Sequence, residues 1–472
     1  MKRGQLVEWI WLASKTALLV VLAGVHAHAQ LPPESEHVIP FKVLFTGNTG
    51  ASIDVCGCPV DVRGGVAARA YVIEEELAEV ERLLLLDAGG LFQGKEATDR
   101  KRAEVYLQAM SLMNYTAMLV GETELLYGYD FLAEQLGKWG LPAVASNIVV
   151  PTDVCPPWES ILLVEFPRLR VALIGLAAND PELLPEGFAI SDPIEAASEA
   201  VQRIGDSADL ILALSTLPFE QEKNLLRAVP EIHLLLSGQM GRPLQRVYGA
   251  FAGHSGKGGQ EINVIRATYK PILESRPFSF LVTPRNVRPE RGVNPVVQDL
   301  VEQFYESVRQ EALPRMEQLK RLSEQPVENL AGNSYVGSST CAKCHTNEYE
   351  QWKHTRHSSA MLSLLNLNRH YLPECLTCHT TGYGYPGGFG KVELESTLAG
   401  VGCESCHGPG GLHLQQSQRK DWIRAKVPDA ICRDCHDEKN DPDFLDNAKQ
   451  KRKTILHTNV PPGFQQQEPK SH

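Results

Sequence analysis

Short apolar segments alternate with longer amphipathic stretches over the first 290 residues of the chain. The short segments are rich in leucine and β-branched residues, which is typical of buried strands. We interpret seven of them as strands: Phe41–Phe45, Arg82–Asp87, Ala117–Gly121, Ala143–Ala145, Val171–Leu176, Leu210–Ser215 and Ile232–Ser237. Because strands that alternate with helices are typical of layered α/β domains, the pattern predicts an α/β fold for this part.

An amphipathic helix is predicted next. Its apolar positions recur every three or four residues up to about Pro314, at Val297, Leu300, Val301, Phe304, Tyr305 and Val308. The following stretch, Leu313–Ser334, is charged and interrupted by prolines and by Gly332, which predicts a hinge. A chain of 472 residues is long for one domain, so we expect the helix and hinge to link two domains.

The C-terminal part has weak periodicity and carries four copies of Cys-x-x-Cys-His. Each copy supplies two thiols that add to the vinyl groups of a haem, and a histidine that ligates the iron from the proximal side. The predicted attachment residues are Cys341, Cys344, Cys375, Cys378, Cys403, Cys406, Cys432 and Cys435, and the proximal ligands are His345, His379, His407 and His436. Because every copy ends in His, four covalently attached c-type haems explain the motifs better than zinc does. The haems would also supply the apolar core that this part lacks.

The N-terminus has the features of a signal peptide. Lys2, Arg3 and Lys15 precede the apolar run Thr16–Val25, and Ala27–Ala29 provides the small residues of a cleavage site. The run is about half of the roughly 20 residues that span a bilayer, so no transmembrane anchor is expected after cleavage. Because haem is attached in this way outside the bacterial cytoplasm, the predicted location is the periplasm, with an extracellular or outer-membrane-associated position left open.

Composition narrows the choice of partners. The hydrophobic content of 43% is that of a soluble globular protein, and the net charge is −11. Basic and acidic residues nearly balance after residue 335, so the acidity belongs to the N-terminal part. Nucleic acid is therefore not expected as a partner, and a redox partner protein with a basic face is favoured. The donor, the acceptor and the oligomeric state stay open.

Three segments of the C-terminal part carry a family resemblance: Tyr335–Met361, Cys375–Phe389 and Leu398–His413, the last with the string GVGCESCHGPG. They resemble the tetrahaem cytochrome c-554 family of electron carriers. The resemblance implies that His357 and His413 are distal iron ligands, with His457 as the nearest candidate for a third. It also implies a five-coordinate second haem, at Cys375–His379, whose open face would bind small ligands.

The N-terminal part carries five motifs in series: Phe45–Gly50, Gly64–Arg69, Leu86–Gly94, Gly121–Glu124 and Ser237–Gly241. Their order and spacing resemble the 5′-nucleotidases of the calcineurin-like metallophosphoesterase superfamily, which implies a two-sheet α/β sandwich with its site at the strand ends. Active members hold two metal ions with Asp, His and Asn ligands. This chain has other residues at those places: Asn48, Gly50, Gly90, Glu122, Thr123, Thr216, Gln239 and Gly241. Hydrolysis of phosphoesters is therefore not expected.

Three further cysteines lie outside the haem motifs. Cys56 and Cys58 follow the first strand, and Cys155 lies in a proline-rich loop. One interpretation is a stabilising disulfide between Cys155 and one of the other two. The alternatives are a redox-active pair of Cys56 and Cys58, and a thiolate site for a soft metal or a sulfur species.

Together these features predict five regions: a signal peptide (1–29), a degenerate phosphoesterase-fold domain (38–290), a linker helix and hinge (291–334), a mostly helical and loop tetrahaem domain (335–440) and a tail (441–472). The predicted function is electron transfer, with the first domain used for docking or for presenting a substrate or thiol. One alternative is a redox enzyme that acts on a small nitrogen or sulfur compound at an open haem or at Cys56 and Cys58. A second alternative is a metal-dependent phosphoesterase.

Overall fold

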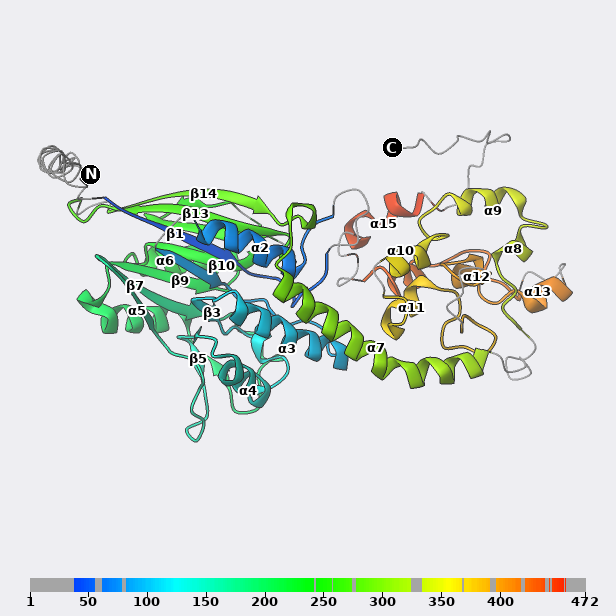
Figure 1. The fold of residues 1–472 in the computed structure, drawn as a ribbon, viewed down its shortest axis with the longest axis horizontal. Coiled ribbons are helices and arrows are strands. Elements are labelled where there is room, and N and C mark those ends of the chain that lie inside the picture. The colour runs from blue at the N-terminus through cyan, green and yellow to red at the C-terminus, as the bar shows by residue number, and fades with distance from the viewer. Residues whose placement is uncertain are drawn as a thin grey trace, which may run out of the picture. The chain divides into compact units, whose positions relative to one another are not determined.

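The computed structural model of this protein divides into two compact units, Met1–Val301 and Glu302–His472. Helix α7 (Pro295–Ser323) runs across the boundary between them (Figure 1). The structure describes residues 38–55, 62–78, 82–241, 243–256, 258–273, 277–323, 333–366, 369–390, 396–416, 421–437, 441, 444–453 and 455.

Two six-stranded sheets form the centre of the first unit (Figure 1). The first sheet has the order β14 (Phe278–Asn286), β13 (Glu261–Tyr269), β1 (Ile39–Thr46), β2 (Leu83–Asp87), β3 (Ala117–Leu119) and β4 (Ala143–Val144). The second has the order β11 (Gln245–Val247), β12 (Ala250–Ser255), β10 (Leu234–Met240), β9 (Leu210–Ser215), β7 (Leu169–Leu176) and β6 (Leu162–Phe166). A small third sheet pairs β5 (Ile148–Val149) with β8 (Ala189–Ile190). All seven predicted strands are present, and the predicted α/β fold is confirmed.

The faces of β1 show how the layers are built. Val43 and Phe45 point into an apolar core that joins the two sheets, together with Leu86 of β2 and Leu212 of β9. Lys42 alternates with them and bonds to helix α2 on the opposite face of the sheet. Because the central parallel strands are buried on both faces, they form nearly continuous apolar runs in the sequence.

Helices cover both outer faces of this sandwich. They are α2 (Val66–Leu77), α3 (Ala97–Leu112), α4 (Tyr129–Trp139), α5 (Pro193–Ile204) and α6 (Phe219–Ala228), with short 3₁₀ turns at Thr123–Leu125, Gly205–Ser207 and Pro289–Arg291. Helix α5 begins at Pro193, because the Asp192 carboxylate accepts hydrogen bonds from the N–H groups of Ile194 and Glu195 and the proline suits the first turn. A second apolar core joins α5 and α6 to the second sheet.

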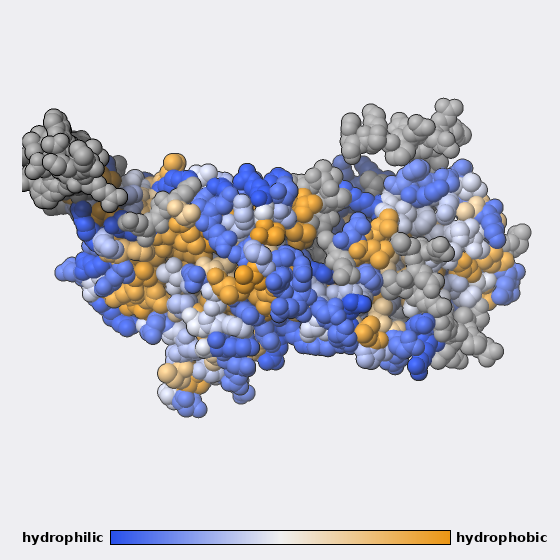
Figure 2. All heavy atoms as spheres, viewed as in Figure 1, coloured by the Kyte–Doolittle hydropathy of each residue, from blue (hydrophilic) through white to orange (hydrophobic). Residues whose placement is uncertain are grey.

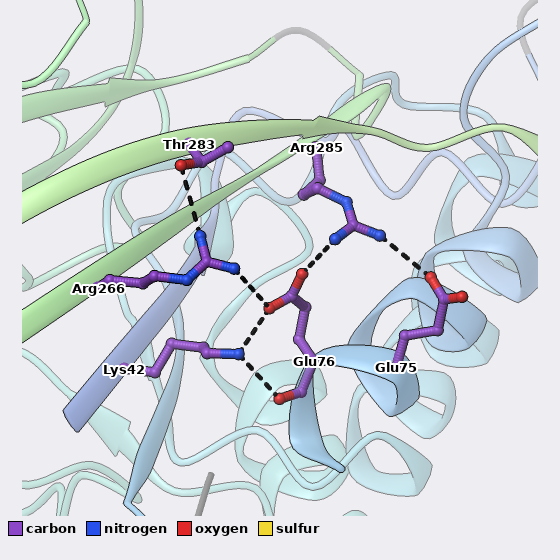
Figure 3. A network of polar contacts seen from close by, with 6 residues as sticks. All are labelled: Lys42, Glu75, Glu76, Arg266, Thr283 and Arg285. Atoms are coloured by element: carbon purple, nitrogen blue, oxygen red, sulfur yellow. Dashed lines mark hydrogen bonds and ion pairs between the residues drawn. The ribbon is translucent and has the colours of Figure 1, made fainter. Parts of the chain in front are cut away.

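A buried ion cluster fastens α2 to the first sheet (Figure 3). Lys42 donates to Glu76 of α2 at 2.7 Å, and both side chains are almost fully buried. Arg285 of β14 donates to the other oxygen of Glu76 at 2.5 Å and to Glu75 at 3.1 Å, and Arg266 of β13 lies 4.0 Å from Glu76. The Glu76 carboxylate therefore neutralises a cation that the core could not otherwise hold.

The second unit is made of short helices and loops. The helices are α8 (Ser338–Cys341), α9 (Thr346–Lys353), α10 (Ala360–Asn366), α11 (Pro373–His379), α12 (Cys403–His407), α13 (Gly411–Gln415), α14 (Asp429–Arg433) and α15 (Phe444–Lys453). One small apolar cluster among its described residues consists of Met361, Leu364, Leu376, Tyr383 and Phe389, and Tyr371, Leu372 and Phe444 are also buried. The predicted mixture of helices and loops is confirmed.

Helix α7 is longer than its apolar pattern predicts. It passes through Pro314 to Ser323, so the prediction that it ends near Pro314 was wrong. Met316, beyond the proline, packs on the small core of the second unit and accepts a hydrogen bond from the Tyr383 hydroxyl at 3.7 Å. This packing offsets the backbone hydrogen bond that the proline removes.

The surface of the first unit is mixed. Figure 2 shows apolar patches among charged residues on the viewed face. On the edge strand β14, Phe280 packs against the core between the sheets, whereas Leu281 is 66% exposed. Among the described helices, none combines the length and the apolar character that crossing a bilayer requires. The predicted signal peptide, residues 1–29, lies outside the described residues.

Candidate functional site

The four Cys-x-x-Cys-His motifs all lie on short helical turns. The N–H of His345 donates to the Cys341 carbonyl at 2.9 Å, and the N–H of His436 donates to the Cys432 carbonyl at 2.8 Å. In a helical turn the residue four positions on lies on the same face, so each histidine is directed to the side of its first cysteine. This is the local geometry that one haem edge and its iron require.

Two pairs of cysteine thiols bring the motifs together, and the Cys406 thiol of the third motif also lies near Cys432 and Cys435 of the fourth. The thiols of Cys341 and Cys403 are hydrogen-bond partners, which places the first motif beside the third. The thiols of Cys378 and Cys435 are also hydrogen-bond partners, which places the second motif beside the fourth. Groups attached to these cysteines would lie close to one another within each pair.

Two pairs of imidazoles face each other at similar separations. The ring centroids of His345 and His413 lie 6.5 Å apart, and those of His357 and His436 lie 6.0 Å apart. With metal–nitrogen bonds of about 2 Å, two imidazoles on opposite sides of one metal ion have centroids about 6 Å apart. Both separations therefore match the distance expected for two histidines that ligate one iron.

Backbone hydrogen bonds from distant segments position His357. Helix α9 ends at Lys353, before His354 and His357, so these two histidines do not share a helical turn. The His357 carbonyl accepts from the N–H of Val401 at 2.9 Å, and the Val401 carbonyl accepts from the Trp352 indole at 2.9 Å. Burial and the neighbouring His436 lower the pKa of His357, which favours the neutral imidazole that ligates metals.

Glu404, inside the third motif, organises the surroundings of His413. Its buried carboxylate accepts hydrogen bonds from the N–H groups of Val336, Gly337 and Gly410, at 2.8 to 3.1 Å. These bonds tie the lead-in to the first motif and the loop before His413 to the third motif. Sequence reasoning missed this role, because a charged residue between two haem cysteines has no distinctive pattern.

Three proximal imidazoles use Nδ1 for a hydrogen bond. The acceptors are the Ala360 carbonyl for His379, at 2.8 Å, and the Arg424 carbonyl for His407, at 2.5 Å. For His436 the acceptor is the Asp441 carboxylate, at 2.7 Å. An Nδ1–H that donates in this way leaves Nε2 free to ligate iron, so the residues present fit haem.

Some predicted site residues are not described by the structure. His457, Cys56 and Cys58 lie outside the described residues. Cys155 is exposed, and its backbone carbonyl accepts a hydrogen bond from the Tyr129 hydroxyl at 2.8 Å. The choice between a disulfide, a redox pair and a thiolate site for these cysteines therefore stays as the sequence leaves it.

The strand ends of the first unit form the second candidate site. The N–H of Asn48 donates to the Gly89 carbonyl at 2.7 Å, and the N–H of Gly50 donates to the Gly90 carbonyl at 3.0 Å. A Cβ atom at Gly90 would lie only 2.8 Å from Cα of Asn48, so this backbone has no room for an aspartate there. The loops after β1 and β2 are therefore closed on each other.

Side-chain hydrogen bonds also join the loops at these strand ends. The Thr216 hydroxyl donates to Glu122 at 2.6 Å, and the Gln239 amide donates to the Thr216 carbonyl at 2.7 Å. Burial raises the pKa of Glu122, and it raises the pKa of Glu124, which accepts from two backbone N–H groups, to about 7. The described residues contain no cluster of three or more His, Cys, Asp or Glu suited to hold a metal ion.

Comparisons with known proteins relate the two halves of the chain to different families. Residues 340–408 match the family model described as Cytochrome c554 and c-prime. Cytochrome c-554 of Nitrosomonas europaea is 33% identical over 121 residues, which cover 21% of this chain and 52% of that protein. The C-terminal resemblance is confirmed, and it implies covalently bound c-type haem.

The 5′-nucleotidase of Vibrio vulnificus is 27% identical over 227 residues, which cover 45% of this chain and 40% of that protein. A solved structure, the 5′-nucleotidase precursor from Thermus thermophilus, matches with a TM-score of 0.51 and 19% identity over 57% of this chain and 59% of that one. The chain therefore spans about half the length of the relatives it matches. The metallophosphoesterase-like fold of the first unit is confirmed.

Proposed function

We propose that this protein is an exported tetrahaem c-type cytochrome that transfers electrons. The observation that carries the proposal is the pair of facing imidazoles at each of two motifs, His345 with His413 and His436 with His357, at the separation of a bis-histidine iron. When bound, each haem supplies an iron that accepts and releases one electron. The chain holds the haems by thioethers and imidazoles and places motifs side by side, which favours transfer between them.

The proposed ligands follow from this arrangement. His413 completes the haem of the first motif, and His357 completes the haem of the fourth. His457 is the nearest candidate for a third distal ligand, from the family resemblance alone. A periplasmic location and redox partner proteins with a basic face are part of the same proposal.

We assign a non-hydrolytic role to the first unit, as a docking surface or as a support that presents a substrate or thiol. The closed strand ends support this assignment, because Gly90 and Asn48 leave no room for a bridging carboxylate. Assays with nucleotides and sugar phosphates, with manganese or zinc added, should show no metal-dependent cleavage. Cleavage at a rate typical of enzymes would establish the phosphoesterase alternative instead.

Haem content and spectroscopy test the main proposal. The purified protein should contain four haems, and all of its haem should be reducible and reoxidisable in a potentiometric titration. Replacing His413 by Ala should convert one low-spin bis-histidine signal to high spin in magnetic resonance spectra. The matched control, His354→Ala, should leave all signals unchanged. Fewer than four haems, or an unchanged spectrum for the His413 variant, would overturn the proposal.

A second candidate function is redox catalysis at the haem of the second motif. The family resemblance implies an open face on this haem, and among the described residues no imidazole is paired with His379 as His413 is with His345. The resemblance, rather than this absence, distinguishes the second motif from the third. A haem with an open face would bind carbon monoxide or nitric oxide when reduced. Binding of one such ligand per chain favours this candidate, and turnover of a nitrogen or sulfur compound would establish it. Reduced protein that binds neither gas excludes the haem version, and turnover that requires Cys56 and Cys58 would support the thiol version.

A further inference from the structure

The proximal imidazoles of the second unit differ in the charge of their hydrogen-bond acceptors. His379 and His407 donate to neutral backbone carbonyls. His436 donates to a carboxylate oxygen of Asp441 at 2.7 Å. The acceptor at the fourth motif is therefore anionic, whereas those at the second and third are uncharged.

The backbone after the fourth motif holds Asp441 in this position. The N–H of Asp441 donates to the Asp437 carbonyl at 2.8 Å, and the Asp441 carbonyl accepts from the N–H of Phe444 at 2.9 Å. The Phe444 ring, at the start of helix α15, stacks on the imidazole of His436 with centroids 4.6 Å apart and planes 19° apart. Both the carboxylate and the ring plane of His436 are thereby fixed.

Helix α15 also supplies a counter-charge. Lys451 donates to the second oxygen of Asp441 at 2.5 Å. The neighbouring Arg452 donates to the Val427 carbonyl at 2.7 Å and forms an ion pair with Asp429. These contacts anchor the helix to the segment before the fourth motif, so Lys451 stays within reach of Asp441.

An anionic acceptor makes the ligating imidazole a stronger electron donor than a neutral acceptor does. A stronger donor stabilises ferric iron relative to ferrous iron, and hydrogen bonding of this kind is one means by which a protein sets a haem potential. Lys451 acts in the opposite direction, because its positive charge offsets part of the charge on Asp441.

We propose that Asp441 is a positioning residue that lowers the reduction potential of the haem at Cys432–His436, and that Lys451 limits the size of the effect. This inference rests on the proposed electron-transfer function. On reduction one electron from a donor protein or a mediator converts ferric to ferrous iron, no bond is formed or broken, and the proton stays on Nδ1 of His436.

The test is a potentiometric titration of the full haem-loaded protein, followed by optical and magnetic resonance spectra. Replacing Asp441 by Asn should increase the ratio of reduced to oxidised haem about tenfold at one site, at fixed potential, which is about 59 mV for a one-electron couple. The Lys451→Gln variant should shift the same haem in the opposite direction. The matched control is Asp434→Asn, which removes an exposed carboxylate from the same motif.

The outcomes separate this inference from the proposed function. Four reversible haems with no shift in the Asp441 variant, or with equal shifts in the Asp441 and Asp434 variants, would overturn the inference and leave electron transfer intact. Loss of one haem in the Asp441 variant would indicate a purely structural role if the Lys451 variant also shows no shift. A chain with fewer than four haems would instead contradict the proposed function.

Discussion

The two units of this chain are stabilised in different ways. The first unit has two extended apolar cores, one between its sheets and one beneath α5 and α6. The second unit has a single small cluster among its described residues and relies on hydrogen bonds between distant loops, such as those to Glu404. The first unit therefore has enough apolar core to fold by itself, whereas the second unit requires a bound apolar group in addition to its own side chains.

The same contrast extends to the candidate sites. At the strand ends of the first unit, polar groups bond to one another, as Thr216 does to Glu122. In the second unit the ring centroids of His345 and His413 lie 6.5 Å apart, a separation that fits two ligands of one iron. Polar side chains that hydrogen-bond to one another stabilise the fold. Imidazoles held at the separation of two iron ligands are suited to bind a cofactor.

The largest expected effect comes from omitting haem. If the full chain is produced without haem attachment, residues 335–453 should lose protection in hydrogen–deuterium exchange, because their own core is too small to support a fold. Core strands of the first unit, such as β7 and β9, should stay protected as in the haem-loaded protein. Protection of α11 and α12 without haem would contradict the contrast between the two units.

A large effect within the first unit is expected at Glu76. Glu76→Gln removes the carboxylate that lies 2.7 Å from the buried Lys42 ammonium, so the free energy of unfolding should fall by about 3 to 5 kcal/mol, as measured by denaturant titration. The control Glu75→Gln removes a carboxylate that is 42% exposed and should cost less than about 1 kcal/mol. Equal effects of the two changes would show that burial does not determine the strength of this cluster.

Continuous apolar runs made the central strands predictable. Parallel strands such as β9 are buried on both faces, so their sequence cannot be mistaken for a surface segment. The antiparallel β14 was not predicted, because it is an edge strand with one face exposed and its signal is weaker; β13, which lies between β14 and β1 and is mostly buried, was also missed. Helix α7 was predicted too short because Met316 packs with residues far along the chain.

The haem motifs were predictable because covalent chemistry fixes their spacing. The pairing of the imidazoles could not be predicted in the same way. His357 follows the first motif in the sequence, but its ring lies beside that of His436 in the fourth motif. Asp441 could not be found either, since its contact with His436 depends on the turn that follows the motif. Contacts that depend on the path of the chain leave no local pattern.

A smaller effect, a loss of about 3 kcal/mol in the free energy of unfolding, is expected when the pH is raised. Burial raises the pKa of Glu124 from 4.5 to about 7 and that of Asp87 from 3.8 to about 6. A carboxyl group whose pKa is higher in the folded state stabilises the fold fully below its unfolded pKa, and this contribution is lost as the pH rises through the folded value. The first unit should therefore lose stability between about pH 4.5 and pH 7, by about 3 kcal/mol from Glu124 alone.

Amide hydrogen–deuterium exchange in β2 and β3, corrected for the intrinsic exchange rate at each pH, measures this loss in the intact protein. Glu124→Gln should flatten the pH dependence, because the amide does not ionise. The Glu134→Gln control changes an exposed carboxylate and should leave the slope unchanged. A stability that rises over this range would contradict the raised pKa.

The smallest expected effect concerns helix α7, which both units share. The Asn294 side chain accepts a hydrogen bond from the N–H of Val297 at 2.9 Å and caps the helix, so Asn294→Ala should cost about 1 kcal/mol. The loss should appear as faster exchange in the first turn of α7 and in α2, because the Asn294 side-chain amide also donates to Glu74 of α2 at 2.5 Å. Further along the helix, the Tyr305 carbonyl accepts a hydrogen bond from the Tyr371 hydroxyl at 3.0 Å, inside the second unit. Hydrogen–deuterium exchange around Tyr305 and Tyr371 should not change. If it does, α7 transmits stability between the two units, and they cannot be treated as independent folds.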